Sequence, residues 1–417
     1  MNTAATTTNY SQPYRPLLIR ALNGVGGPFS GPLDPDRLLL SARKDTGLHN
    51  LSDAPLMEPL GRLCAALNAE ALLSPFGRIV QGTRLKTLIV NRLRLDDLMR
   101  RHPEILRQPD PEILLIAGLA RTGTTLLHRS LASDPNARSA ASWETLNPAP
   151  IPREKPGHPT KRQKRGKQAQ RMMGWLAPDF ADVHPVDANQ PEEDILLLDL
   201  TMISQTAEAV SWVPSYSAWL EMIDHRPAYA YLRDVLKTLN WLRPGTHWVL
   251  KTPNHAEQLA AVFDTFPRAT VLMTHRDPVK TVASCASLMA HTVGLSTDAV
   301  DPEAIARQWL RKSVRMADRA KAARAANPDR KVIDIDYNSL IADPGRVIDD
   351  IYALHGAPLT DTGAASATYA ALQPKPAAGK THAYALSDFG LTENEVRSAF
   401  STYLADHPEL ERTATHG

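Results

Sequence analysis

A glycine-rich segment that begins at Gly118 contains the residues of an anion-binding loop. Gly118 and Gly123 are separated by four residues, which is the P-loop spacing, but Thr124 follows where a P-loop has lysine. Such glycines let the backbone curl, so that N–H groups at the start of the following helix point at an anion. Arg121 adds a planar guanidinium, and Thr124 and Thr125 add hydroxyl donors. The loop is predicted to bind a phosphate-bearing nucleotide without the lysine that reaches the β- and γ-phosphates of ATP or GTP.

A second candidate anion site follows a later apolar run. Arg276 stands between His275 and the Asp277-Pro278 pair, and Ser284 lies eight residues beyond it. A helix that begins near Pro278 suits the preference of proline for the first turn, and it would carry Ser284 close to the same anion. Because open α/β sheets bind ligands at the carboxyl ends of their strands, Arg276 is expected at the same edge as the glycine-rich loop. An arginine after a strand is by itself more often a salt-bridge partner, so the argument rests on two anion sites at one edge.

The elements that position these residues are indicated by short, mostly apolar runs. Runs of this kind are typical of strands buried on both faces. They occupy residues 112–117, 247–250, 269–274 and 331–335. Helical patterns lie between them, and strands that alternate with helices predict a parallel sheet with right-handed crossovers.

The sequence therefore predicts an α/β fold, with a P-loop-like core in which a central parallel sheet is flanked by helices. Residues 1–35 are interpreted as irregular and residues 36–102 as helical, so residues 1–105 form an N-terminal region before the α/β domain at 106–417. Residues 147–245 interrupt the alternation and are expected to form a helical and loop insertion over the acceptor side of the active site.

Composition excludes several classes of protein. The chain has 417 residues, a formal net charge of +2 and 43% apolar residues, which is typical of a folded protein and not of a dedicated nucleic-acid binder. Its apolar runs are too short for a membrane span. Two cysteines, Cys64 and Cys285, form no disulfide framework, and residues 1–6 lack the features of a signal peptide. A cytoplasmic protein is expected.

Seven segments together resemble the sulfotransferase family, in the bacterial-type branch that shares features with the tyrosylprotein sulfotransferases. The first and fifth are specific together and the others are supporting. The segments are LARTGTTLLH (119–128), WETLNP (143–148), PEED (191–194), LKTPNH (250–255), THRDP (274–278), YNSL (337–340) and DFGL (388–391). The resemblance covers the chain from about residue 110 to near its end. It implies the donor 3′-phosphoadenosine 5′-phosphosulfate, whose product is adenosine 3′,5′-bisphosphate, and a mechanism that requires no metal.

The resemblance also implies which residues hold the donor. Arg276 and Ser284 would hold the 3′-phosphate. In the family a basic loop near the C-terminus closes on the nucleotide, which here would include Lys380 and Tyr384. The 5′-phosphosulfate end would lie against Arg121, Thr122, Gly123, Thr124 and Thr125.

Sulfuryl transfer needs a base for the acceptor hydroxyl, a cation on the bridging oxygen and in-line positioning. Glu144 is the first choice of base, because the tyrosylprotein enzymes carry their catalytic glutamate at the matching place. His184 and His255 are alternatives, since an imidazole has a pKa near neutrality and the cytosolic sulfotransferases use a histidine. Lys251 is favoured as the cation because it ends a strand at the same sheet edge.

The sequence predicts the chemical class of the acceptor but not its identity. Trp212, Tyr216 and Trp219 in the insertion could line an apolar pocket, which slightly favours a small-molecule or lipid-like alcohol. The basic segment within residues 161–171 is interpreted as a solvated helix face, with a lid over an anionic ligand or a surface that meets anionic substrates as the alternative. A P-loop kinase of a small metabolite and a non-catalytic nucleotide-binding module stay open as other functions, and a homo-oligomer stays open as the assembly state.

Overall fold

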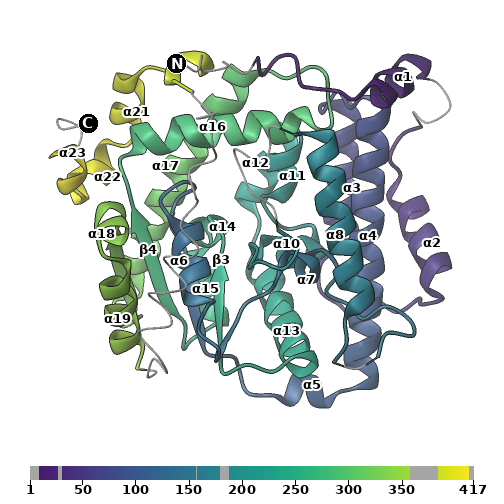
Figure 1. Ribbon diagram of the computed structural model, residues 1–417, viewed down its shortest axis with the longest axis horizontal. Coiled ribbons are helices and arrows are strands. Elements are labelled where there is room, and N and C mark those ends of the chain that lie inside the picture. Colours follow the sequence, from purple (N-terminus) through teal and green to yellow (C-terminus); the bar gives the residue numbers. More distant parts are fainter. Residues whose placement is uncertain (1–8, 27–30, 156, 179–186, 357–383, 413–417) are drawn as a thin grey trace, which may run out of the picture.

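One central sheet of five parallel strands organises the molecule (Figure 1). The computed structural model describes residues 9–26, 31–155, 157–178, 187–356 and 384–412. The strand order is β2-β3-β1-β4-β5, and each neighbouring pair is parallel. The strands are β1 (Ile113–Ile116), β2 (Ala137–Arg138), β3 (His247–Lys251), β4 (Thr270–His275) and β5 (Val332–Asp336). The predicted α/β class and the four predicted strands are therefore confirmed, whereas the two-residue β2 was not predicted.

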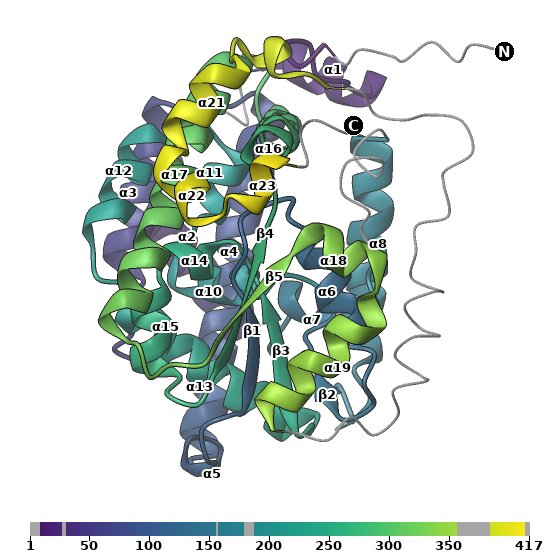
Figure 2. The same ribbon diagram turned by 90° about the vertical axis from the view of Figure 1, so that its left-hand side faces the viewer.

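Strand β1 shows why the apolar runs become central strands. Its four residues are completely buried, because Leu114 and Ile116 face one hydrophobic cluster while Ile113 and Leu115 face the other. Helices α6, α18 and α19 cover the first face, and α13, α15 and α17 cover the second (Figure 2). These six helices are α6 (Thr124–Leu131), α18 (Tyr337–Ala342), α19 (Pro344–His355), α13 (Arg226–Leu242), α15 (Leu259–Thr265) and α17 (Pro302–Ala326).

The N-terminal part is helical, as predicted, and it extends the core of the sheet. Its helices are α1 (Leu17–Val25), α2 (Pro35–Thr46), α3 (Met57–Ala69), α4 (Pro75–Arg101) and α5 (Glu104–Arg107). Leu60 of α3 and Leu93 of α4 belong to the same buried cluster as Leu115 and Val271. These two helices therefore share the hydrophobic core that covers one face of the sheet. The interpretation of residues 1–35 as irregular was wrong for α1, which is a helix.

The remaining elements lie in the connections between strands or, after α19, at the C-terminal end of the described chain. They are α7 (Ser142–Leu146), α8 (Thr160–Leu176), α10 (Ile195–Leu198), α11 (Thr206–Val210), α12 (Pro214–Met222), α14 (Asn254–Glu257), α16 (Pro278–Gly294), α21 (Glu393–Ala399), α22 (Ser401–Asp406) and α23 (Glu409–Arg412), with 3-10 helices η2 (Asp199–Thr201) and η3 (Leu386–Phe389). Among the helices that the structure describes, none combines the length and apolarity that crossing a bilayer requires.

The aromatic residues of the predicted insertion belong to the core. Tyr216 is 1% exposed and its hydroxyl donates to the carbonyl of Met202. Trp212 and Trp219 pack against the same large cluster. Residues 211–219 therefore stabilise the helical layer, and the expected apolar acceptor pocket is not built from these three side chains.

A histidine in this core predicts a loss of stability in mild acid. His128 on α6 is 1% exposed, and burial together with the nearby charge of Lys251 lowers its pKa from its usual value to about 3. The unfolded chain therefore takes up this proton near pH 6.5 and the folded chain does not, so stability is lost as the pH falls below that value. Between pH 7 and pH 5 we expect this group alone to lower the free energy of unfolding by about 2 kcal/mol. Urea unfolding at the two pH values measures this, and His128→Gln should show a smaller difference.

Candidate active site

The loop after β1 has a shape that only its particular residues allow. A Cβ on Gly118 would lie 1.8 Å from Oγ1 of Thr274, so the loop and β4 approach too closely for a side chain there. Gly123 has φ +86° and Arg121 has φ +70°, a conformation that residues other than glycine rarely adopt. Thr122 is completely buried, and its hydroxyl contacts Oγ1 of Thr274 at 2.5 Å and donates to a loop carbonyl. The hydroxyl of Thr122 thus fixes the loop, and it is not exposed to a ligand.

This loop opens into a cavity of about 380 Å³ at the carboxyl edge of the sheet. The cavity combines residues from the loop, α6, α16, α18 and the segments that follow β3 and β4 with one acidic residue from the segment before α10. Its lining includes Ala120, Arg121, Gly123, Thr124, Thr125, Leu126, Glu193, Pro253, Arg276, Leu288, Tyr337 and Ile341. A cavity with a glycine-rich loop and two arginines suits a nucleotide with more than one anionic group.

The two predicted anion sites are joined. Nε of Arg121 donates to Oγ of Ser284 at 2.8 Å, and Nη1 of Arg276 donates to the carbonyl of Arg121 at 2.9 Å. The Arg276 guanidinium also lies over the ring of Tyr337, 4.0 Å from its centre. Helix α16 begins at Pro278, as predicted, with the Asp277 side chain capping its first turn. The sequence therefore placed the loop, Arg276 and Ser284 correctly at one edge.

A lysine–glutamate pair lies at the same cavity, where Glu193 forms part of the lining and Lys251 lies behind it. Nζ of Lys251, at the end of β3, lies 2.5 Å from Oε1 of Glu193 and 3.5 Å from Oγ1 of Thr125. The Lys251 side chain is 3% exposed, whereas that of Glu193 is 24% exposed. The lysine was predicted here, but Glu193 was not, although it lies in the PEED segment that resembles the family. In the sequence, this segment lies between two helices and does not directly follow a strand. The rule that places residues at the carboxyl ends of strands therefore could not assign it to the site.

His255 lies behind this pair in a buried polar network. Its Nε2 is 2.9 Å from the Asp194 carboxylate, and its Nδ1 is hydrogen-bonded to the hydroxyl of Tyr229 at 2.9 Å. Asp194 also accepts the backbone N–H of Lys251 at 2.8 Å. Burial by itself raises the pKa of Asp194, but its contacts with His255 and this N–H outweigh burial and hold the pKa below its usual value. His255 is 0% exposed, so the network supports Lys251, and its placement argues against His255 as the base.

Glu144 lies in a different place from the one predicted. Its carboxylate is 1% exposed and accepts from Arg138 at 2.8 and 3.0 Å and from Arg243 at 3.0 Å. Arg138 is in register with Trp248, and Arg243 precedes β3, so this cluster lies near the start of β3 and not at its Lys251 end. The guanidinium groups of Arg138 and Arg243 both form ion pairs with the Glu144 carboxylate. Glu144 does not line the cavity. The placement argues against Glu144 as the base.

The structural role of Glu144 leads to a prediction. Glu144→Gln removes the charge from a buried pair and leaves the guanidinium of Arg138 without its counter-charge. We expect the free energy of unfolding to fall by about 3 kcal/mol, because breaking a buried pair from one side leaves an uncompensated charge. The activity of each folded molecule should stay near that of the wild type. Chemical denaturation and active-site titration measure the two quantities, and a large loss of kcat without a loss of stability would contradict this role.

Three other predicted residues are not placed at this cavity by the described part of the chain. His184 and Lys380 lie outside the described residues. Tyr384 precedes η3 and is 37% exposed, and it is not part of the cavity lining.

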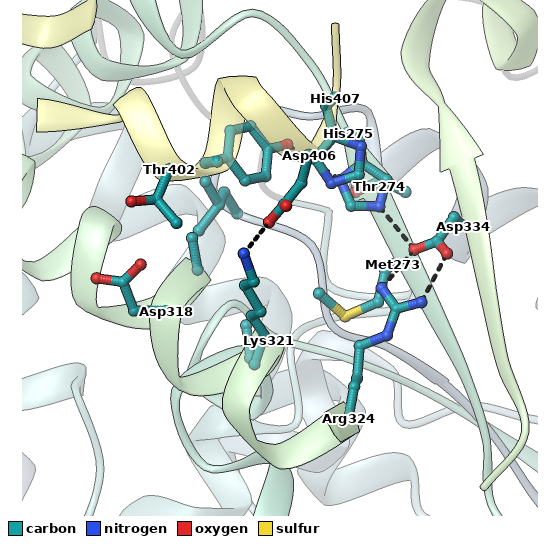
Figure 3. Close-up of a pocket in the computed structure, with 15 residues that line it drawn as sticks. Met273, Thr274, His275, Asp318, Lys321, Arg324, Asp334, Thr402, Asp406 and His407 are labelled. Atoms are coloured by element: carbon teal, nitrogen blue, oxygen red, sulfur yellow. Dashed lines mark hydrogen bonds and ion pairs between the residues drawn. The ribbon is translucent and has the colours of Figure 1, made fainter. Parts of the chain in front are cut away.

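A second cavity, of about 370 Å³, lies beside the end of β4 and between α17 and α22 (Figure 3). The ring of His275 stacks on that of His407 with centres 4.0 Å apart, and its Nε2 lies 2.9 Å from the Asp334 carboxylate. Arg324 donates to both oxygens of the same carboxylate. Burial raises the pKa of Asp334, but the hydrogen bonds of His275 and Arg324 outweigh it and hold the pKa well below its usual value. The Asp334 carboxylate is thus already paired with Arg324 and His275. These contacts stabilise the end of β4, which Arg276 directly follows.

The fold and the first cavity define an α/β protein with a P-loop-like fold, in which a loop between a strand and a helix lies beside cationic residues at the ends of strands. The chain belongs to the sulfotransferase family, whose model matches residues 111–361. A comparison with curated proteins found no match.

Two solved structures are similar to almost the whole chain. Sulfotransferase STF1 from Mycobacterium tuberculosis H37Rv is 31% identical with a TM-score of 0.77, and the match covers 88% of this chain and 98% of that one. Sulfotransferase STF9 from Mycobacterium avium is 26% identical with a TM-score of 0.81, and the match covers 91% of this chain and 98% of that one. The chain is thus a sulfotransferase by family and by fold.

Proposed function

We propose that this sulfotransferase moves a sulfuryl group from 3′-phosphoadenosine 5′-phosphosulfate to an acceptor hydroxyl by in-line displacement. The observation that carries the proposal is one cavity lined by a lysine-free P-loop, Arg121, Arg276 and Glu193, with Ser284 hydrogen-bonded to Arg121 and Lys251 paired with Glu193 directly behind this lining. The loop suits one anionic end of the donor, and the arginine group suits a second phosphate. A nucleotide with a 3′-phosphate uses both.

The residues of the cavity divide between the two ends of the donor. The backbone N–H groups at the start of α6 and the hydroxyls of Thr124 and Thr125 hold the 5′-phosphosulfate end. Arg276 and Ser284 hold the 3′-phosphate, while Tyr337 offers an aromatic face beside them. Lys380 and Tyr384 stay a prediction of a closing segment near the C-terminus.

Glu193 and Lys251 have the geometry for the chemical step. The acceptor oxygen forms a bond to sulfur as the bond between sulfur and the bridging oxygen breaks, and the acceptor proton moves to the Glu193 carboxylate. Lys251 donates to the bridging oxygen, which gains negative charge as the bisphosphate leaves. Their contact at 2.5 Å holds the two side chains next to each other. The side chains of Glu193 and Lys251 perform both tasks.

The acceptor and the compartment stay at the level of proposals. A small-molecule or lipid-like alcohol is the acceptor class, although Trp212, Tyr216 and Trp219 lend it no support because they lie in the core. Both thiols are buried and free, and burial raises the pKa of Cys64 and Cys285 to about 12. Two unpaired thiols suit a reducing compartment, which supports a cytoplasmic location.

Calorimetric titration with adenosine 3′,5′-bisphosphate, ADP and 5′-AMP tests the proposal. We expect the bisphosphate to bind at least tenfold more tightly than either competitor, because only it carries the 3′-phosphate that Arg276 recognises. Equal or tighter binding of ADP with magnesium would favour a kinase of a small metabolite. Tight bisphosphate binding without turnover of any alcohol in a broad panel would favour a non-catalytic nucleotide-binding module.

A further inference from the structure

Helix α8 presents a cationic stripe to solvent. It contains six lysine or arginine residues and no acidic residue in its 17 positions. Within the described part of the chain, no carboxylate is paired with four of them. These four are Lys164, Arg165, Lys167 and Arg171, and all are exposed.

The rotation of α8 is fixed by its inner face. Gly166 packs so closely against α7 that a Cβ there would lie 2.5 Å from Cβ of Trp143. Arg162 is 5% exposed, forms an ion pair with Glu154 at 2.8 Å and donates to the carbonyl of Pro148. Because these two contacts hold one side of the helix against the protein, the cationic stripe is held facing outward.

The stripe ends in apolar side chains. Met172 is 53% exposed and Trp175 is 43% exposed, and both continue the outward spacing of Lys164, Arg165 and Arg171. A helix whose outward face combines lysine and arginine with tryptophan is typical of segments that lie at a membrane interface, where the indole sits among the headgroups.

A second exposed apolar helix lies toward the same end of the molecule. On α1, Leu17 is 80%, Leu18 73% and Val25 73% exposed. Helix α1 contacts the start of α4, where the backbone N–H of Phe76 donates to Asn23. In addition to burial, the nearby charge of Arg165, close to the start of α8, lowers the pKa of Arg94 in the last third of α4. The start of α8 therefore lies near the end of α4, and α8 runs from there toward the start of α4 and α1 (Figures 1 and 2).

We infer that the outward faces of α8 and α1, which we call the α8–α1 surface, dock on an anionic lipid bilayer surface. The cations suit lipid phosphates, and the apolar side chains at the same end insert at the headgroup level. A nucleic acid would use the cations but leave five large apolar side chains in water, so it explains only half of the surface. The inference does not depend on the proposed reaction, because binding is measured without donor or acceptor.

Co-sedimentation of the full chain with vesicles tests this. Vesicles of phosphatidylcholine that contain about 30% phosphatidylglycerol should bind the protein, whereas pure phosphatidylcholine vesicles should bind it at least tenfold more weakly. Reversal of three charges (Lys164→Glu, Lys167→Glu, Arg171→Glu) should weaken binding at least 100-fold, since each basic residue near the surface contributes about fivefold. Met172→Ala with Trp175→Ala should weaken it about tenfold and leave the salt dependence unchanged.

The matched control reverses three exposed charges elsewhere, at Arg107, Lys331 and Arg346, and should bind vesicles within twofold of the wild type. Circular dichroism confirms that each variant is folded. Absence of vesicle binding by the wild type, or an equal loss in the control, overturns the inference. So does binding to single-stranded DNA that exceeds vesicle binding and depends on the same three lysine and arginine residues.

Discussion

Replacing Glu193 by glutamine should lower kcat by about three orders of magnitude, which is within the range that a general base contributes. The amide has nearly the same shape but cannot take the proton of the acceptor hydroxyl. Binding of adenosine 3′,5′-bisphosphate should stay equal or become tighter, because the variant removes a negative charge 2.5 Å from Lys251 in a cavity that receives an anion. Steady-state kinetics with a fixed acceptor, together with calorimetry of the bisphosphate, separates the two effects.

Glu144→Gln is the matched control for this prediction. It makes the same chemical change at a carboxylate that is held by Arg138 and Arg243 near the start of β3. The expected pattern is a catalytic defect for Glu193→Gln and a stability defect for Glu144→Gln. The reverse pattern would restore Glu144 as the base and reduce Glu193 to an ion-pair partner of Lys251.

The central strands could be predicted because both of their faces are buried. A strand such as β1, in which every side chain is covered, must be apolar throughout, and that leaves a clear signal in the sequence. Strand β2 has two residues and leaves no such signal. Helix α1 follows a proline and precedes glycines, and it is attached by Arg15, which donates to the carbonyls of Gly294 at the end of α16 and of Thr297 beyond it. That contact joins residues far apart in the chain, so the local sequence could not show it.

The candidate site also contains residues that could be predicted from the sequence and one residue that could not. Residues that directly follow strands, such as Lys251 and Arg276, could be placed because parallel strands end at one edge. Glu193 could not, because its position depends on contacts between distant loops. The backbone N–H groups of Ser142 and Trp143 donate to carbonyls of residues 190 and 188, which brings the segment before α10 to the cavity. Because those hydrogen bonds join backbone atoms, they do not require particular residue types and cannot be predicted from the sequence.

Arg276→Ala should weaken binding of adenosine 3′,5′-bisphosphate by about 100-fold, because the variant removes a charge-assisted contact with the 3′-phosphate. Arg276 also donates to the carbonyl of Arg121, so its loss disturbs the loop slightly. Binding of 5′-AMP reports this second effect alone, and we expect it to change by less than about threefold. Calorimetry with both nucleotides gives the ratio of the two losses, which isolates recognition of the 3′-phosphate from support of the loop.

Two further variants sharpen this test. Arg276→Lys keeps the charge but loses the planar fork and the contact over Tyr337, so it should recover only part of the affinity for the bisphosphate. Ser284→Ala removes a single hydroxyl that already accepts from Arg121, and it should cost about tenfold or less. Equal losses for the bisphosphate and for 5′-AMP in Arg276→Ala would mean that this arginine holds the loop and does not read the 3′-phosphate. Recognition of the donor would then have to come from elsewhere in the cavity.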